Sequence, residues 1–162
     1  MSVVRIGILG GTGPAGRALA ARLASVGFDV VIGSRSAQRA AQVRDTLIAR
    51  WAQLELPIAA AENAGAADAD LVVVATPWEA AASTALAAAD RLEGKVVVSI
   101  ANALARVGHE FQPLVPPRGS VAASVQAAVP RALVAAALHH VPARELGDLR
   151  AAVQSDVLVC SD

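Results

Sequence analysis

The feature that most constrains the fold is a glycine-rich loop near the N-terminus, placed between an apolar run and a helical pattern. The loop contains Gly11-x-Gly13-x-x-Gly16 and follows residues 3–9, a mostly apolar run that predicts a buried strand. Beyond the loop, apolar residues recur at helical spacing at positions 15, 19, 23 and 26, and a second apolar run covers 30–32. The sequence therefore predicts strand, helix and strand in succession, which is the unit of a parallel sheet covered by helices.

The ends of this first helix are marked as well. Pro14 stands where a first helical residue is expected, and Gly27 where the chain would leave the helix. In such a unit the glycines allow a tight turn, the close approach of a pyrophosphate and close packing of helix on strand, while the helix N-terminus attracts phosphates. We therefore predict a dinucleotide site that includes Gly11, Thr12, Gly13, Pro14, Ala15 and Gly16. The alternative is a turn without a ligand.

The end of the second strand bears on the choice of nucleotide. NAD-binding folds carry an acidic residue about 20 residues past the glycines, but 33–36 contains none. Ser34 and Arg35 stand there instead, with Arg39 one helical turn later and Thr12 facing the same region. Hydroxyl and guanidinium groups bind a 2′-phosphate, so the sequence favours NADP over NAD. The alternative is that Ser36 caps the next helix and the arginines are solvated.

Composition narrows the class of protein. Of the 162 residues, 55% are hydrophobic and only 2% aromatic, so the core must consist of Ala, Val, Leu and Ile, in one domain. Lys+Arg and Asp+Glu balance at 14 each, which argues against a nucleic-acid surface. No apolar run is long enough for a bilayer, and no signal peptide precedes the first strand. With a single cysteine, Cys160, these features predict a cytoplasmic protein that does not bind membranes.

The rest of the chain continues the alternation of strands and helices, which predicts a doubly wound, Rossmann-like α/β fold with a parallel sheet. Trp51 is expected to anchor a helix to the core. Strands are expected at 58–60, 71–75, 95–100, 132–138 and 156–160, helices at 36–54, 79–92 and 120–129, a turn or short helix at 62–67, and a loop at 107–119.

Several residues fall at the carboxyl ends of these strands, the edge where doubly wound sheets bind ligands. They are Ala75, Thr76 and Pro77 after one strand and Asn102 after the next. Trp78 could cover a cofactor, although packing is the more common role of an aromatic residue at a strand end. No spacing of His, Cys, Asp and Glu indicates a metal site, and no nucleophile–base arrangement is present.

With these residues in view, the sequence resembles the NADPH:F420 oxidoreductases, in which coenzyme F420 is a deazaflavin. The matching segments follow one another in family order. They are Ile8-Leu-Gly-Gly-Thr-Gly13, Val31-Ile-Gly-Ser-Arg-Ser36, Ala75-Thr-Pro-Trp-Glu79, Ser99-Ile-Ala-Asn102, His139-His-Val-Pro-Ala143 and Asp156-Val-Leu-Val-Cys160. One departure is Asn102-Ala-Leu, where the family has Asn-Pro-Leu.

The resemblance implies roles for particular residues. Thr12, Ser34, Arg35 and Arg39 stand where the family holds the 2′-phosphate, and His139 and Val141 where it lines the nicotinamide and the deazaflavin. It implies a single NADP-binding domain over 1–162, with a small C-terminal part starting near 139. Family members continue into a closing segment beyond the final strand that helps to form the deazaflavin site and dimer contacts, and the sequence ends at Asp162.

The function implied is hydride transfer between NADP(H) and F420. Separately, the expected apolar strand at 156–160 would expose surface that a further helix normally covers, which predicts at least a dimer. Hydride transfer needs two stacked rings and no protein nucleophile, so His139 is expected to position a ring rather than transfer a proton. Alternatively, His139 and His140 only bind backbone at a strand end. Two other functions stay open: an NADP-dependent reductase of another small acceptor, and a non-catalytic NADP-binding module.

Overall fold

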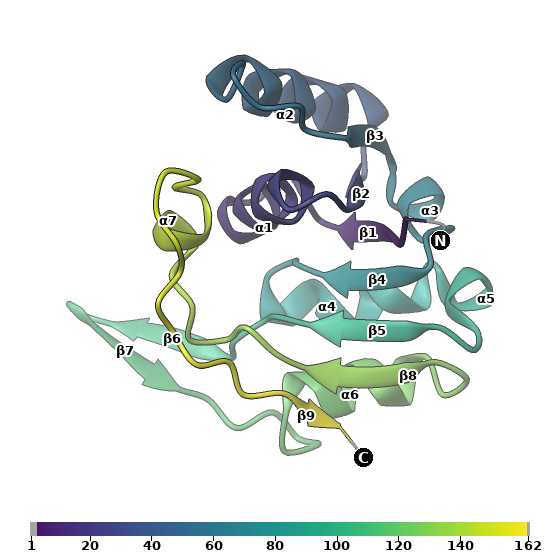
Figure 1. Cartoon of the computed structure of the whole chain (residues 1–162). Coiled ribbons are helices and arrows are strands. Elements are labelled where there is room, and N and C mark those ends of the chain that lie inside the picture. The colour runs from purple at the N-terminus through teal and green to yellow at the C-terminus, as the bar shows by residue number, and fades with distance from the viewer. Residues whose placement is uncertain (1–2, 162) are drawn as a thin grey trace.

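The structure is a computed structural model that describes residues 3–161 (Figure 1). Its elements follow in the order β1 (Arg5–Leu9), α1 (Pro14–Ser25), β2 (Asp29–Ser34), α2 (Ala37–Arg50), β3 (Ile58–Glu62), α3 (Asn63–Ala66), β4 (Leu71–Val74), α4 (Trp78–Leu86), α5 (Ala89–Leu92), β5 (Val96–Ser99), β6 (Leu104–Val107), β7 (Glu110–Pro113), α6 (Val121–Ala128), β8 (Leu133–Ala136), α7 (Ala143–Leu146) and β9 (Cys160–Ser161).

One sheet organises the chain, with strand order β3-β2-β1-β4-β5-β8-β9. Its first six strands are parallel, and only β9 runs antiparallel to its neighbour β8. The strand order reverses at β1, which pairs with β2 on one side and β4 on the other. This confirms the doubly wound α/β fold expected from the sequence.

Two apolar clusters cover the two faces of the sheet, because successive strand side chains point to opposite sides. Ile6 and Ile8 of β1 belong to the cluster that includes α1 and α2, with the buried Trp51 as the expected anchor. Leu9 belongs to the other cluster, which includes α4, α5 and α6. Figure 1 shows α1 and α2 on one side of the sheet and α4 and α6 on the other.

The first helix confirms its expected ends. Pro14 is its first residue, and Gly27 has a φ of +94°, a conformation that glycine adopts easily. The expected apolar stripe is only partly right. Leu19 is buried, but Val26 lies past the helix end and is exposed. The buried face is instead made largely of alanines, whose small side chains let α1 lie close to its neighbours.

Two other expectations from the sequence are wrong. The helix expected over 79–92 is broken into α4 and α5, because Ala88 leaves helical geometry with φ −117° and ψ 14°. This break buries both Ala88 and Leu92 in the core. The loop expected over 107–119 contains part of a hairpin formed by β6 and β7. Gly108, with a φ of +61°, occupies the first central position of its two-residue turn, as in a type II′ turn.

The C-terminal strand also differs from its expected range, 156–160. Only Cys160 and Ser161 pair with β8, opposite Ala136 and Ala135. Residues before Cys160 would face positions beyond Ala136, where β8 has already ended. They therefore have no ladder to join, and Leu158 and Val159 are exposed. Among residues 3–161, no helix has the length and apolarity needed to cross a membrane.

Candidate functional site

A crevice of about 590 Å³ lies at the carboxyl ends of β1, β2 and β4, where the strand order reverses. One wall is the glycine loop after β1 and the segment after β2, and the other is the segment after β4 with the first turns of α4. The crevice brings together most of the predicted cofactor residues. These are Thr12, Gly13, Ser34, Arg35, Arg39, Ala75, Thr76 and Pro77.

The glycine loop turns tightly between β1 and α1 and lies close to both. A Cβ on Gly13 would lie 3.7 Å from the nearest backbone oxygen, so one added carbon fits beside this residue without a clash. A Cβ on Gly16 would lie 2.7 Å from Gly11 Cα, which shows that α1 packs against the loop. Gly10, outside the predicted three glycines, takes the left-handed turn with a φ of +71°.

The N-terminus of α1 is available to an anion. Its N-cap residue is Gly13, which has no side chain to accept a hydrogen bond from the first turn, and the turn contains no acidic residue. The first N–H groups of α1 therefore have no side-chain cap within residues 3–161, and the positive end of the helix dipole lies at the crevice. Pro14 and Ala15 line the neighbouring part of the site, while Gly11 and Gly16 support the loop from behind.

Thr76 supplies an independent sign of a missing partner. Its Oγ1 is buried and makes no hydrogen bond within residues 3–161, although such atoms are nearly always paired. Thr76 borders the crevice, and its methyl group would be 2.5 Å from a Cβ on Gly10, so the loop and the end of β4 touch. The residues present thus fit a bound polar ligand.

The residues after β2 combine both interpretations of the sequence. Ser36 does cap α2, since its Oγ accepts a hydrogen bond of 3.3 Å from the Arg39 N–H. Ser34 is buried at the strand end, and its Oγ accepts from the Ser36 N–H. The guanidinium groups of Arg35 and Arg39 make no hydrogen bond or ion pair within residues 3–161, and both side chains line the crevice. The cap of the alternative is therefore present, and the two guanidinium groups border the crevice beside it.

A second cavity, of about 540 Å³, continues the site across the sheet edge. It shares Gly13, Ala75, Thr76 and Pro77 with the first and extends to Asn102 after β5 and Ala143 of α7. Trp78 lines this cavity and also packs against the core, so its two suggested roles are compatible. An elongated ligand can therefore span from the end of β2 to the end of β5.

His139 and Val141, which the resemblance assigned to the reacting rings, are not among the residues that line this second cavity. Leu138 has a φ of +63°, a strained conformation directly before His139. The Asn102 side-chain amide donates to the His139 carbonyl and fixes this bend. Burial lowers the pKa of the His139 imidazole below its usual value, and His140 lowers it further. Val141 is buried against Ala18 and Leu146.

Sequence analysis missed residues that the tertiary structure brings into the crevice. Asn63 accepts a hydrogen bond of 3.1 Å from the Gly10 N–H through its Oδ1, and so holds the turn of the glycine loop. Its position directly after β3 was the available signal, since a polar residue at a strand end faces this edge. Ser83 and Thr84 of α4 line the opposite wall, and nothing in the local sequence distinguishes them.

Comparison with known proteins identifies the family of this chain. The family model described as NADP oxidoreductase, coenzyme F420-dependent, matches residues 5–103. An F420-dependent NADP reductase of Methanocaldococcus jannaschii is 37% identical over 98% of this chain and 73% of its own length. One from Methanothermobacter marburgensis is 30% identical with the same coverage. A solved structure of an Arthrobacter sp. FB24 protein has 30% identity and a TM-score of 0.76, covering 98% of this chain and 74% of that one. The chain belongs to the family of coenzyme F420-dependent NADP oxidoreductases.

Proposed function

We propose that this protein transfers hydride between NADP(H) and the deazaflavin coenzyme F420. The observation that carries the proposal is the continuous site at the strand-order reversal. It joins an uncapped helix N-terminus to two unpaired arginines on one side and to Asn102 on the other. The relatives described as F420-dependent NADP reductases support the identity of the second substrate.

The first cavity is assigned to the adenosine and pyrophosphate part of NADP(H). The open side of Gly13 and the N–H groups of α1 would receive the pyrophosphate. Ser34, Arg35 and Arg39 would bind the 2′-phosphate through charge-assisted hydrogen bonds, with Thr12 on the adjoining loop. This arrangement favours NADP(H) over NAD(H), because none of the described residues that line the cavity has a carboxylate to accept hydrogen bonds from a ribose 2′-hydroxyl.

The second cavity is assigned to the reacting rings. NADP(H) supplies the hydride chemistry, so the protein's task is to hold two rings in contact and to exclude water. Thr76 and Pro77 lie where the two cavities meet, and Asn102 fixes the backbone of His139 beside them. With its pKa lowered, the His139 imidazole is neutral near pH 7, which suits positioning rather than proton donation.

The decisive experiment mixes NADPH, F420 and the protein and follows the visible absorbance of the deazaflavin. We expect a protein-dependent loss of absorbance, with NADPH binding roughly 10–100-fold more tightly than NADH, as one or two charge-assisted bonds imply. Arg35→Ala should remove most of that preference, whereas Arg131→Ala, remote from the site, should leave it unchanged.

Other results would point elsewhere. Equal affinities for the two nucleotides would contradict the assignment of the 2′-phosphate site. Tight NADPH binding without any change in F420 absorbance would instead favour another acceptor or a non-catalytic nucleotide-binding role.

We further infer that the protein acts as a homodimer, with residues 1–162 forming one NADP-binding domain. Leu133 beside β9, together with Leu158 and Val159, leaves apolar side chains exposed along one edge of the sheet. Association would cover this edge, which is otherwise prone to pairing. The cytoplasmic location expected from the lone Cys160 stays a prediction.

A further inference from the structure

A third cavity lies away from the two already assigned, on the outer side of α1 between α2 and α7. It measures about 450 Å³. Three arginines border it, one from each helix: Arg17 of α1, Arg50 of α2 and Arg144 of α7. The remaining lining is apolar or small apart from Thr46, and in the part of the chain that the structure describes it includes no carboxylate. We call these three residues and the cavity between them the arginine pocket.

The positive charge of the arginine pocket is not neutralised by the described protein. Within residues 3–161, none of its three guanidinium groups makes a hydrogen bond or an ion pair, and Arg50 stacks over the Trp51 ring at 5.4 Å from the ring centre. Asp148, whose charge Arg50 also feels, already accepts two side-chain bonds from Arg150, of 2.7 and 2.8 Å. Three like charges in a chain of zero net charge form a local field that attracts anions.

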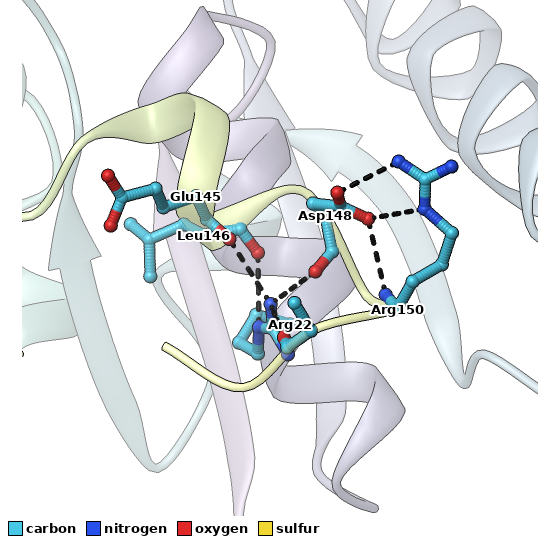
Figure 2. Close-up of polar contacts among 6 residues, drawn as sticks. Arg22, Glu145, Leu146, Asp148 and Arg150 are labelled. Carbon is cyan, nitrogen blue, oxygen red and sulfur yellow. Dashed lines mark hydrogen bonds and ion pairs between the residues drawn. The ribbon is translucent and has the colours of Figure 1, made fainter. Parts of the chain in front are cut away.

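The α7 side of the arginine pocket is docked firmly on α1. Arg22 of α1 donates hydrogen bonds to the carbonyl oxygens of Glu145, Leu146, Asp148 and Ala151, as Figure 2 shows for the first three. Gly147 packs directly on Ala18, because a Cβ there would lie 3.3 Å from the Ala18 Cβ. Arg144 is therefore presented by a segment that is docked on α1 at several points.

The arginine pocket adjoins the cavity assigned to the reacting rings. Pro14 and Ala143 line both cavities. A molecule whose ring lies at the sheet edge could extend past these two residues and reach Arg17, one helical turn beyond Pro14. Arg39 of the proposed 2′-phosphate site lies in the first turn of α2, whereas Arg50 is the last residue of that 14-residue helix. The arginine pocket is therefore separate from the proposed 2′-phosphate site.

We propose that the arginine pocket binds the phosphate- and carboxylate-bearing side chain of the second substrate, while its ring lies in the neighbouring cavity. Guanidinium groups bind both kinds of oxyanion in bidentate fashion, and three of them suit a multiply charged group. This inference rests on the proposed function, since F420 is a deazaflavin ring joined to such an anionic side chain.

The test compares F420 with the same deazaflavin lacking its phosphate-bearing side chain, by fluorescence titration of protein saturated with NADP⁺. Arg17→Gln, Arg50→Gln and Arg144→Gln should each weaken F420 binding by about 3–10-fold, the range expected for exposed charge-assisted contacts. Binding of the truncated deazaflavin should not change. Added salt should reduce the difference, and the remote control Arg131→Gln should bind both ligands like the wild type.

Unchanged F420 affinity in all three variants would overturn the proposal, as would equal weakening of both deazaflavins. A second measurement separates this inference from the proposed function. With NADP⁺ bound, inorganic pyrophosphate should raise the melting temperature of the wild type but not of the triple variant. That result supports anion binding in the arginine pocket even if neither deazaflavin binds, in which case the proposed function fails. The absence of any stabilisation by pyrophosphate would count against the pocket itself.

Discussion

Replacing Arg22 by alanine should release the α7 segment from α1. The guanidinium group makes four hydrogen bonds of 2.7–3.2 Å to main-chain carbonyls after position 144, across more than 120 positions of sequence. Hydrogen bonds to charged groups contribute about 1.5–3 kcal/mol each. Three of these four share one nitrogen and the side chain is only half-buried, so we expect a total of about 2–4 kcal/mol rather than the full sum.

The lost stabilisation should show first as local opening of the α7 segment, before the stability of the whole protein falls. The amides of Glu145, Leu146 and Gly147 donate only within α7 and to Pro142, so their protection depends on the segment staying docked. At 1.36 kcal/mol per tenfold change, their exchange should become about 30–1,000-fold faster in Arg22→Ala. Hydrogen exchange followed by mass spectrometry over 143–151 measures this directly.

A matched control is available in Arg91→Ala. Arg91 pairs with Asp68 on an exposed surface, where a salt bridge is worth under about 1 kcal/mol. Arg22→Lys should restore less than half of the lost protection, because one ammonium group cannot reach four carbonyls. If Arg22→Ala exchanged at the wild-type rate over 143–151, the four bonds would contribute nothing to docking and the reasoning would be refuted.

The remaining predictions concern the cofactor loop, His139 and assembly. Gly13→Val should abolish nucleotide binding while circular dichroism stays unchanged, since a Cβ there meets the protein only at 3.7 Å and the branched side chain would occupy the pyrophosphate space. Retained binding would reduce the loop to a turn. His139→Ala should slow hydride transfer from deuterated NADPH less than about 100-fold, with the isotope effect kept and no pH dependence of the rate above pH 7. If His139 transferred a proton, its removal would lower the rate by about 10²–10⁴-fold. Sedimentation should show a dimer, and a monomer at all concentrations would exclude association through the β8–β9 edge.

Local sequence signals were sufficient to predict those features that a single residue and its near neighbours determine. Pro14 begins a helix because it needs no N–H partner there, and Ser36 caps one because its hydroxyl reaches the Arg39 N–H. The alternation of apolar runs and helical patterns predicted a parallel sheet and the positions in the chain of the six strands that the structure shows to be parallel. The glycine loop and the residues after β2 and β4 followed from these, since parallel strands bring their carboxyl ends to one edge.

Tertiary packing decided where some helices and strands end, which the local preferences of their residues do not determine. Alanine favours helix at 87 and 88, yet the chain turns there because burying Leu92 in the core outweighs propensity. The terminal strand shortened because its partner β8 ends at Ala136, which is a property of another segment.

The same holds for the sites. Asn63 reaches Gly10 across 53 positions, and Arg22 reaches the α7 segment across more than 120. Arg17, Arg50 and Arg144 are three unremarkable surface residues in the sequence, and only the packing of three helices places them around one cavity. Contacts at such separation depend on how the elements pack, whereas caps, turns and periodicity depend on neighbours within a few residues, and only those neighbours can be seen in the sequence.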